Sequence, residues 1–170
     1  MTAGRTRIKI CGLSRVEDID YVNEALPDYC GFVIGVPSSR RNVTVEQLIS
    51  LKERLSDRIC PVGVFVNAEQ ELVAELLNGG VIDIAQLHGR EDEIYIRRLR
   101  DLTDKPLIKA FSVQNLSDLE TAEKSSADLV PWITGKAAPG HLLNGNFSGI
   151  GKKDRTFWQA GWMPGISLKR

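Results

Sequence analysis

The sequence is short of the residues that mark several protein classes. It has three cysteines, so an odd count and wide spacing argue against a disulfide framework and favour a reducing, cytoplasmic location. No apolar run approaches the roughly 20 residues of a membrane span. Met1 to Arg7 contains no apolar signal-peptide core. Lys and Arg balance Asp and Glu at 22 each, which leaves no basic surface for nucleic acid. Cysteine and histidine show no metal-ligand spacing.

What the chain does contain is a repeated alternation of strand and helix patterns. Its 170 residues suffice for one domain with a core. The expected strands are continuous apolar runs, as in a parallel sheet covered on both faces: Ile8–Cys11, Cys30–Ile34, Pro61–Val66, Ile82–Gln86, Leu107–Phe111 and Asp128–Val130. The expected helices are Val16–Glu24, Val45–Leu55, Glu69–Leu77, Asp92–Leu102 and Leu116–Glu123, with starts marked at Thr44 and Ser117. This alternation predicts βαβ units.

The last 40 residues have a different character. Residues 131–170 are rich in glycine, hold all three tryptophans and show no clean period. No strand or long helix is expected there, and taken alone the segment is a disordered tail or a divergent loop region.

Several polar residues fall at the carboxyl ends of the expected strands, where barrel active sites lie. Cys11 could act as a base or nucleophile, or be a small packing residue. Arg40 and Arg41 could bind a carboxylate or phosphate, or form a solvated turn. His88 could transfer protons or be structural. Lys109 could face the barrel mouth or form an internal ion pair. The two remaining cysteines, Cys30 and Cys60, begin strands and are expected to be packing residues.

Taken together and in this order, six short motifs resemble phosphoribosylanthranilate isomerase. The resemblance covers about Arg7 to Val130. The motifs are Lys-Ile-Cys-Gly (Lys9–Gly12), Gly-Phe-Val (Gly31–Val33), Ser-x-Arg-x-Val (Ser39–Val43), Val-Gly-Val-Phe-Val-Asn (Val62–Asn67), Gln-Leu-His-Gly (Gln86–Gly89) and Ile-Lys-Ala (Ile108–Ala110).

The resemblance implies a (β/α)8 TIM barrel and an Amadori rearrangement in tryptophan biosynthesis. It implies a small phosphorylated substrate and no metal or cofactor. Cys11 matches the family's general base, and Arg41 matches the residue that holds the anthranilate carboxylate. Arg40 falls on a variable position. By the same resemblance Lys9, Gln86 and His88 are expected to line the substrate site.

The match breaks where the family's general acid, an aspartate ending the sixth strand, should stand. The chain has Pro131-Trp132-Ile133 there, so the general acid is absent from the position near Trp132. We hypothesise that from about Pro131 the chain is translated in the wrong reading frame. If the last base of each codon is joined to the first two of the next, Trp132 with Ile133 must encode aspartate. The same shift over Phe157 to Pro164 permits Leu-Ala-Gly-Gly-Leu-Asp-Ala, the family's seventh-strand motif.

The expected product is an incomplete barrel. Residues 1–130 would supply about five and a half of the eight βα units, and residues 131–170 an irregular tail. The open sheet would leave two edges and uncovered apolar faces, which predicts poor solubility and impaired activity. A different interpretation is a non-catalytic half-barrel that completes its sheet with a partner chain, using the tail as an interaction segment. A third, indole-glycerol-phosphate synthase, lacks visible support beyond Lys109.

Overall fold

The structure of the chain is a computed structural model that describes residues 7–113, 122, 124–128, 132–134 and 157–161. Its helices are α1 (Val16–Ala25), α2 (Val45–Glu53), α3 (Gln70–Asn78) and α4 (Glu93–Leu102). Its strands are β1 (Arg7–Cys11), β2 (Tyr29–Ile34), β3 (Asn42–Val43), β4 (Cys60–Phe65), β5 (Ile84–Leu87), β6 (Leu107–Lys109), β7 (Phe111–Val113), β8 (Trp132–Thr134) and β9 (Phe157–Gly161).

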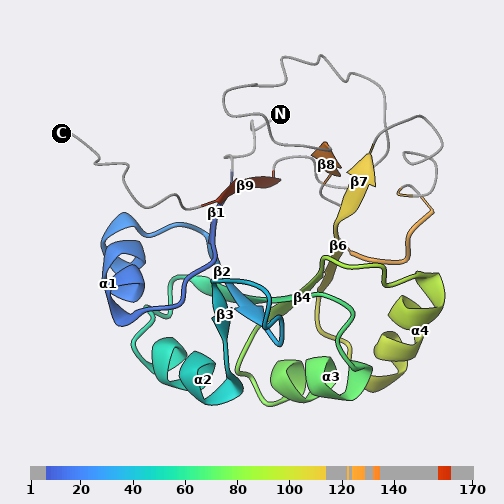
Figure 1. Ribbon diagram of the computed structural model, residues 1–170, viewed down its shortest axis with the longest axis horizontal. Helices are drawn as coiled ribbons and strands as arrows, with labels where there is room; N and C mark the ends of the chain where they lie inside the picture. Colours follow the sequence, from blue (N-terminus) through green and yellow to red (C-terminus); the bar gives the residue numbers. More distant parts are fainter. Residues whose placement is uncertain (1–6, 114–121, 123, 129–131, 135–156, 162–170) are drawn as a thin grey trace.

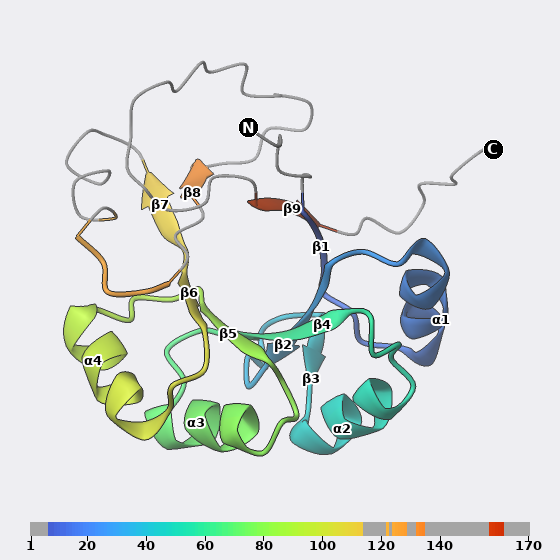
Figure 2. The same ribbon diagram turned by 180° about the vertical axis from the view of Figure 1, so that it is seen from behind.

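The main sheet is parallel and curved. Its strand order is β6-β5-β4-β2-β1-β9, with β3 beside β2, and a helix connects most successive strands on the way from β1 to β6. Figure 1 shows α1 to α4 as an arc outside the sheet, and Figure 2 shows the same arc from behind. This confirms the predicted fold class, because a parallel sheet curved inside a layer of helices is part of a (β/α)8 barrel. None of the helices found in the described residues has the length and apolarity to cross a bilayer.

Two apolar clusters occupy the two faces of the sheet. The larger one lies between the strands and the helices, and it includes Cys30, Phe32 and Leu87 together with Leu48 of α2. The smaller one consists of Tyr29, Val62, Ile84 and Ile108 on the concave face, with Cys60 packed against it. Successive strand residues point to opposite faces, so this division follows from the register of the strands. Both Cys30 and Cys60 therefore pack, as expected from the sequence.

The helix boundaries follow from capping groups that are visible in the sequence. Thr44 accepts a hydrogen bond from the Gln47 amide, and the Gln47 side chain accepts one from the Thr44 amide, which forms a capping box at the start of α2. Asp92 caps α4 by accepting from the Tyr95 amide. All four helices described here were predicted to within two residues. The helix predicted for Leu116–Glu123 lies outside the described residues except for Ala122.

The last two predicted strands need correction. The run Leu107–Phe111 is divided at Ala110, and Phe111 begins β7, which pairs with β8 in a separate two-stranded sheet. Asp128 is not in a strand: its carboxylate accepts from the Leu107 amide at 2.7 Å and from Arg100, at the beginning of β6. The difference arises because the short Asp128 side chain accepts from the Leu107 backbone amide, an interaction that competes with strand pairing. The rest of that predicted strand, residues 129 and 130, lies outside the described residues.

The segment expected to hold no strand contains two. β9 pairs in parallel with the whole of β1, from Arg7 opposite Phe157 to Cys11 opposite Gly161. The expected open edge at β1 is therefore occupied. The physical reason is that β1 presents a row of backbone donors and acceptors, which favours pairing with any extended segment within reach.

Candidate active site

The concave face of the sheet brings together three of the polar residues expected at the site. Lys9 and Cys11 lie two residues apart on β1, so their side chains point to the same face. The Lys9 Nζ atom donates a hydrogen bond to Cys11 Sγ at 3.5 Å and another to Gln86 Oε1 of β5. Two other strands, β2 and β4, stand between β1 and β5 in the sheet. The lysine side chain therefore reaches across the inside of the curve.

Gly31 of β2 provides the space that this arrangement needs. It stands opposite Cys11 in the register. A Cβ atom at Gly31 would lie 2.6 Å from Cys11 Sγ and 3.2 Å from Lys9 Nζ, both closer than ordinary van der Waals contact. Glycine is thus required at this position for a steric reason, since any side chain would displace the thiol or the ammonium.

The three side chains are withdrawn from water. Lys9 and Gln86 are fully buried and Cys11 is 7% exposed. Burial lowers the pKa of Lys9 below its usual value, and interaction with the Cys11 thiol partly opposes that change. A cysteine near a buried ammonium can carry negative charge on sulfur, the form in which a thiol acts as a base.

Arg41 lies next to the same end of β1. A Cβ atom at Gly12 would be 2.4 Å from Arg41 Cδ, so the arginine side chain covers the residue that follows Cys11. Gly12 has φ +91°, a backbone conformation that residues other than glycine rarely adopt. The Arg41 amide donates to Ser39 Oγ at 3.2 Å, which orders the turn that carries it. Arg40, which falls on a variable position of the resemblance, is exposed.

His88 directly follows β5 and lies exposed at the carboxyl end of the sheet. Its amide donates to the Phe65 carbonyl at 2.8 Å, which fixes the backbone beside the end of β4. Partial burial lowers the pKa of the His88 imidazole, and the positive charges of Lys9 and Lys109 act in the same direction. These effects favour the neutral imidazole, which can both donate and accept a hydrogen bond.

Lys109 forms an internal ion pair, which decides between the two interpretations left open by the sequence. Its Nζ lies 2.9 Å from Glu91 Oε2 and 2.9 Å from the Gly89 carbonyl, and the two ionised side chains are 5% and 1% exposed. The Glu91 carboxylate also accepts from the backbone amides of Asn67 and Gly89 at 2.7 and 2.8 Å. This group of residues, here called the Glu91 cluster, joins the loops after β4 and β5 to β6.

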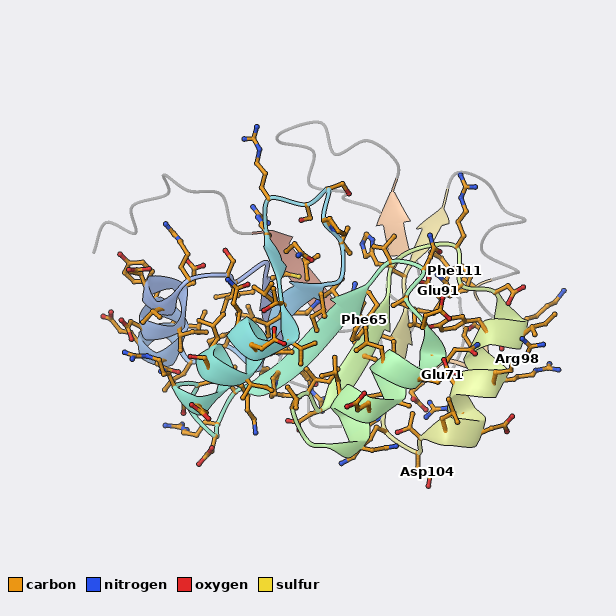
Figure 3. The ribbon with its side chains drawn as sticks, turned by 60° about the horizontal axis from the view of Figure 1, so that its bottom comes forward. Phe65, Glu71, Glu91, Arg98, Asp104 and Phe111 are labelled. Atoms are coloured by element: carbon orange, nitrogen blue, oxygen red, sulfur yellow. The ribbon has the colours of Figure 1, made fainter. Side chains whose placement is uncertain are left out.

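The Glu91 cluster favours the ionised carboxylate. Burial alone would raise the pKa of Glu91, but the hydrogen bonds from Lys109 and from the Asn67 amide outweigh it and lower the pKa. Glu91 and Phe111 line one pocket of about 310 Å³, and Figure 3 shows both at the end of the molecule opposite Asp104. The loop that carries His88 is thus held rigidly at the end of the sheet where the other site residues lie.

Sequence reasoning missed Glu91 and the role of Asn67. Glu91 stands in the polar run Arg90 to Glu93, which is typical of a solvated loop. The signal that could have found it was Lys109, because a lysine in an apolar strand needs a buried acceptor. Asn67 has φ +52° and its Oδ1 accepts from the Arg90 amide at 2.7 Å, so its type is set by backbone geometry.

Trp132, near which the resemblance predicts a general acid that the sequence lacks, belongs to β8. Trp132 stands opposite Phe111 in the parallel pair of β7 and β8. β7 and β8 form a two-stranded sheet of their own, so the register of β8 is defined against β7 and not against β6. No group of three or more potential metal ligands occurs in the part of the chain that the structure describes.

Comparison with known proteins agrees with this architecture. The family model of N-(5'-phosphoribosyl)anthranilate (PRA) isomerase matches residues 8–160. Isomerases of this name from Endomicrobium trichonymphae and a Thermoanaerobacter strain are 43% and 35% identical, over 64% and 86% of this chain. These matches cover only 54% and 66% of the two relatives, so the chain spans between half and two thirds of their length.

Solved structures give the same result for the fold. The crystal structure of phosphoribosyl anthranilate isomerase from Thermus thermophilus is 31% identical, with a TM-score of 0.65 over 77% of this chain and 64% of that one. A second structure holds the isomerase in complex with reduced 1-(o-carboxyphenylamino)-1-deoxyribulose 5-phosphate; it is 32% identical, with a TM-score of 0.62 over 70% of this chain and 60% of that one. The chain therefore belongs to the phosphoribosylanthranilate isomerase family.

Proposed function

We propose that this chain derives from an isomerase that converts N-(5'-phosphoribosyl)anthranilate to 1-(2-carboxyphenylamino)-1-deoxyribulose 5-phosphate. The observation that carries the proposal is the placement of Cys11 at the carboxyl end of β1, with Arg41 over the next residue. The relative of known structure that binds a reduced form of this product supports the choice of substrate. A cytoplasmic location is part of the proposal and is supported by three unpaired cysteines.

In this proposal Cys11 is the general base and Arg41 holds the anthranilate carboxylate through its guanidinium. Protonation of the ring oxygen opens the sugar to an iminium. The Cys11 thiolate then takes the proton from C2', becoming a thiol, and the resulting enol tautomerises to the aminoketose. His88, Gln86 and Lys9 are proposed to line the substrate site. His88 is exposed at the end of β5, where a substrate hydroxyl could reach its imidazole.

The proton donor for ring opening is missing from the printed chain, and we propose a reading-frame error as the reason. The shifted frame encodes aspartate across Trp132 and Ile133, in the strand that pairs with β7. We therefore expect the printed chain to have little or no isomerase activity and the frame-restored chain to be active. An in-frame coding sequence around codons 128 to 134, without an insertion or deletion relative to close relatives, would contradict the proposed cause.

Complementation of a bacterial tryptophan auxotroph that lacks this isomerase tests the function. The frame-restored chain should support growth without tryptophan, and its Cys11→Ser variant should not. Cys60→Ser is the matched control, because Cys60 begins β4 at the opposite end of the sheet and should be dispensable. Failure of the frame-restored chain to complement, when it is expressed and folded, would refute the proposed function.

The half-barrel that pairs with a partner chain is less well supported. It was expected to pair through the open edges of the sheet, and the edge at β1 is occupied because β9 pairs with all five residues of β1. The strands at the two ends of the described sheet are β6 and β9. Analytical ultracentrifugation of the purified chain tests this alternative. A defined dimer would favour the half-barrel that pairs with a partner chain over an isomerase barrel cut short by a reading-frame error.

A further inference from the structure

Lys9 is buried in a way that substrate binding does not explain. Its side chain is fully buried, and its Nζ already donates to Cys11 Sγ and to Gln86 Oε1. Within the residues that the structure describes, Lys9 makes no salt bridge with a carboxylate. Lys109, by comparison, is paired with Glu91.

A buried ammonium without an anionic partner is costly, since its charge is removed from water and hydrogen bonds to neutral acceptors replace only part of the lost solvation. The amide oxygen of Gln86 accepts a hydrogen bond from Lys9, but the amide carries no net charge. Cys11 is the acidic group in contact with Lys9 Nζ, at 3.5 Å. A proton that moves from the thiol to a neutral Lys9 amine turns two isolated polar groups into an ion pair.

We propose that Lys9, oriented by Gln86, is a positioning residue that holds Cys11 as a thiolate in a buried thiolate–ammonium pair. The inference rests on the proposed function only in taking Cys11 as the general base. Lys9 and Gln86 still line the proposed substrate site, and the inference assigns them a role there through their contacts with Cys11. The amide oxygen of Gln86 accepts from Lys9 and so keeps the ammonium directed across the space left by Gly31.

The proton balance of the proposal is simple. The sulfur–hydrogen bond of Cys11 breaks and a nitrogen–hydrogen bond forms on Lys9, with no proton lost to solvent. When the thiolate later takes the C2' proton, Cys11 becomes a thiol and Lys9 stays an ammonium. Return of the cysteine proton to the product or to water restores the pair. No oxidant, metal or co-reactant is needed.

Among the side chains that the structure describes, the other charged or titratable groups near the pair come from β2 and from the loops after β5 and before β3. From β2, the Cys30 thiol interacts with Lys9, and burial raises the pKa of Cys30 above its usual value. After β5, His88 is affected by the charge of Lys9. Before β3, the Arg41 side chain covers Gly12. None of these groups supplies a negative charge at neutral pH.

The ultraviolet absorbance of the thiolate tests the proposal on the purified chain without any isomerase assay. Burial raises the pKa of Cys60 to about 12 and also raises that of Cys30, so both remain thiols at neutral pH. Thiolate absorbance at neutral pH should therefore come from Cys11, and Cys11→Ser should abolish it. Lys9→Met should reduce it about tenfold or more, because an opposite charge in contact is lost.

Further variants separate charge from packing. Lys9→Arg keeps the positive charge and should retain more thiolate than Lys9→Met. Gln86→Leu should reduce the thiolate less than Lys9→Met, because it removes the group that orients the ammonium and not the charge. Circular dichroism of each variant verifies the fold. Equal thiolate absorbance in the folded Lys9→Met variant and the parent would overturn the proposal, whereas failed complementation by the frame-restored chain would overturn the function and leave this result standing.

Discussion

Two buried lysines of the same sheet have very different surroundings. Lys109 on β6 has a carboxylate and a backbone carbonyl at 2.9 Å, and these connect it to two loops. Lys9 on β1 has a thiol at 3.5 Å and a side-chain amide. The first lysine is fully compensated and holds the loops in place. The charge of the second lysine is compensated only if the Cys11 thiol in contact with it ionises. A fold can in this way favour the reactive form of a weakly acidic side chain.

The largest expected effect comes from breaking the compensated pair. Lys109→Met should lower the free energy of unfolding by about 3–5 kcal/mol, because Glu91 would remain as a buried and unpaired charge. Urea denaturation measures the loss. The double variant Lys109→Met with Glu91→Leu should recover most of it, since both charges are then gone. A single variant as stable as the parent would contradict the structural role given to the pair.

A smaller effect is expected from filling the space beside Cys11. Gly31→Ala places a Cβ 2.6 Å from Cys11 Sγ and should cost about 1–3 kcal/mol of unfolding free energy by overpacking. It should also reduce the Cys11 thiolate absorbance. Gly63→Ala is the matched control, because its Cβ would be 2.6 Å from Ile82 on the other face of the sheet. If both variants change the thiolate equally, the space at Gly31 has no special role.

Lys9→Met should not lower the free energy of unfolding, in contrast to Lys109→Met. It removes a buried ammonium that no carboxylate compensates, so the unfolding free energy should stay equal or rise by about 1 kcal/mol. The same variant should lose the thiolate signal. Urea denaturation of both methionine variants in one buffer makes the comparison direct. A loss as large as that of Lys109→Met would show that the two lysines are equivalent structural cations.

The last prediction concerns how Glu91 makes stability depend on pH, which is measured as a slope and not as a loss at neutral pH. Its folded pKa lies below the value in the unfolded chain, about 4.3. The stabilisation is therefore fully present above that unfolded value and is lost as pH falls through the folded pKa. Unfolding free energies measured at several acidic pH values should fall more steeply for the parent than for Glu91→Gln. Parallel curves would mean that Glu91 titrates alike in both states.

The sequence predicted the elements whose patterns are local and missed those set by distant partners. The helices around Thr44 and Asp92 carry their own capping groups, so their starts were predictable. Cys11 and Gln86 were singled out by the resemblance, but their contacts through Lys9 depend on the curvature of four strands, which no local pattern shows. Glu91 was missed because its burial comes from Lys109, 18 residues away. The roles of these residues in catalysis stay predictions.

The pairing of β9 with β1 has a consequence for which backbone groups of the sheet remain exposed. The ladder of hydrogen bonds joins main-chain groups, and these are the same whatever codons are read. If the segment is out of frame, an unselected peptide occupies the place beside β1 that selection shaped for another strand. The exposed edge of the main sheet then moves from β1 to β9, while β6 stays at the other end, so the place at which a neighbouring molecule can pair is shifted and not removed.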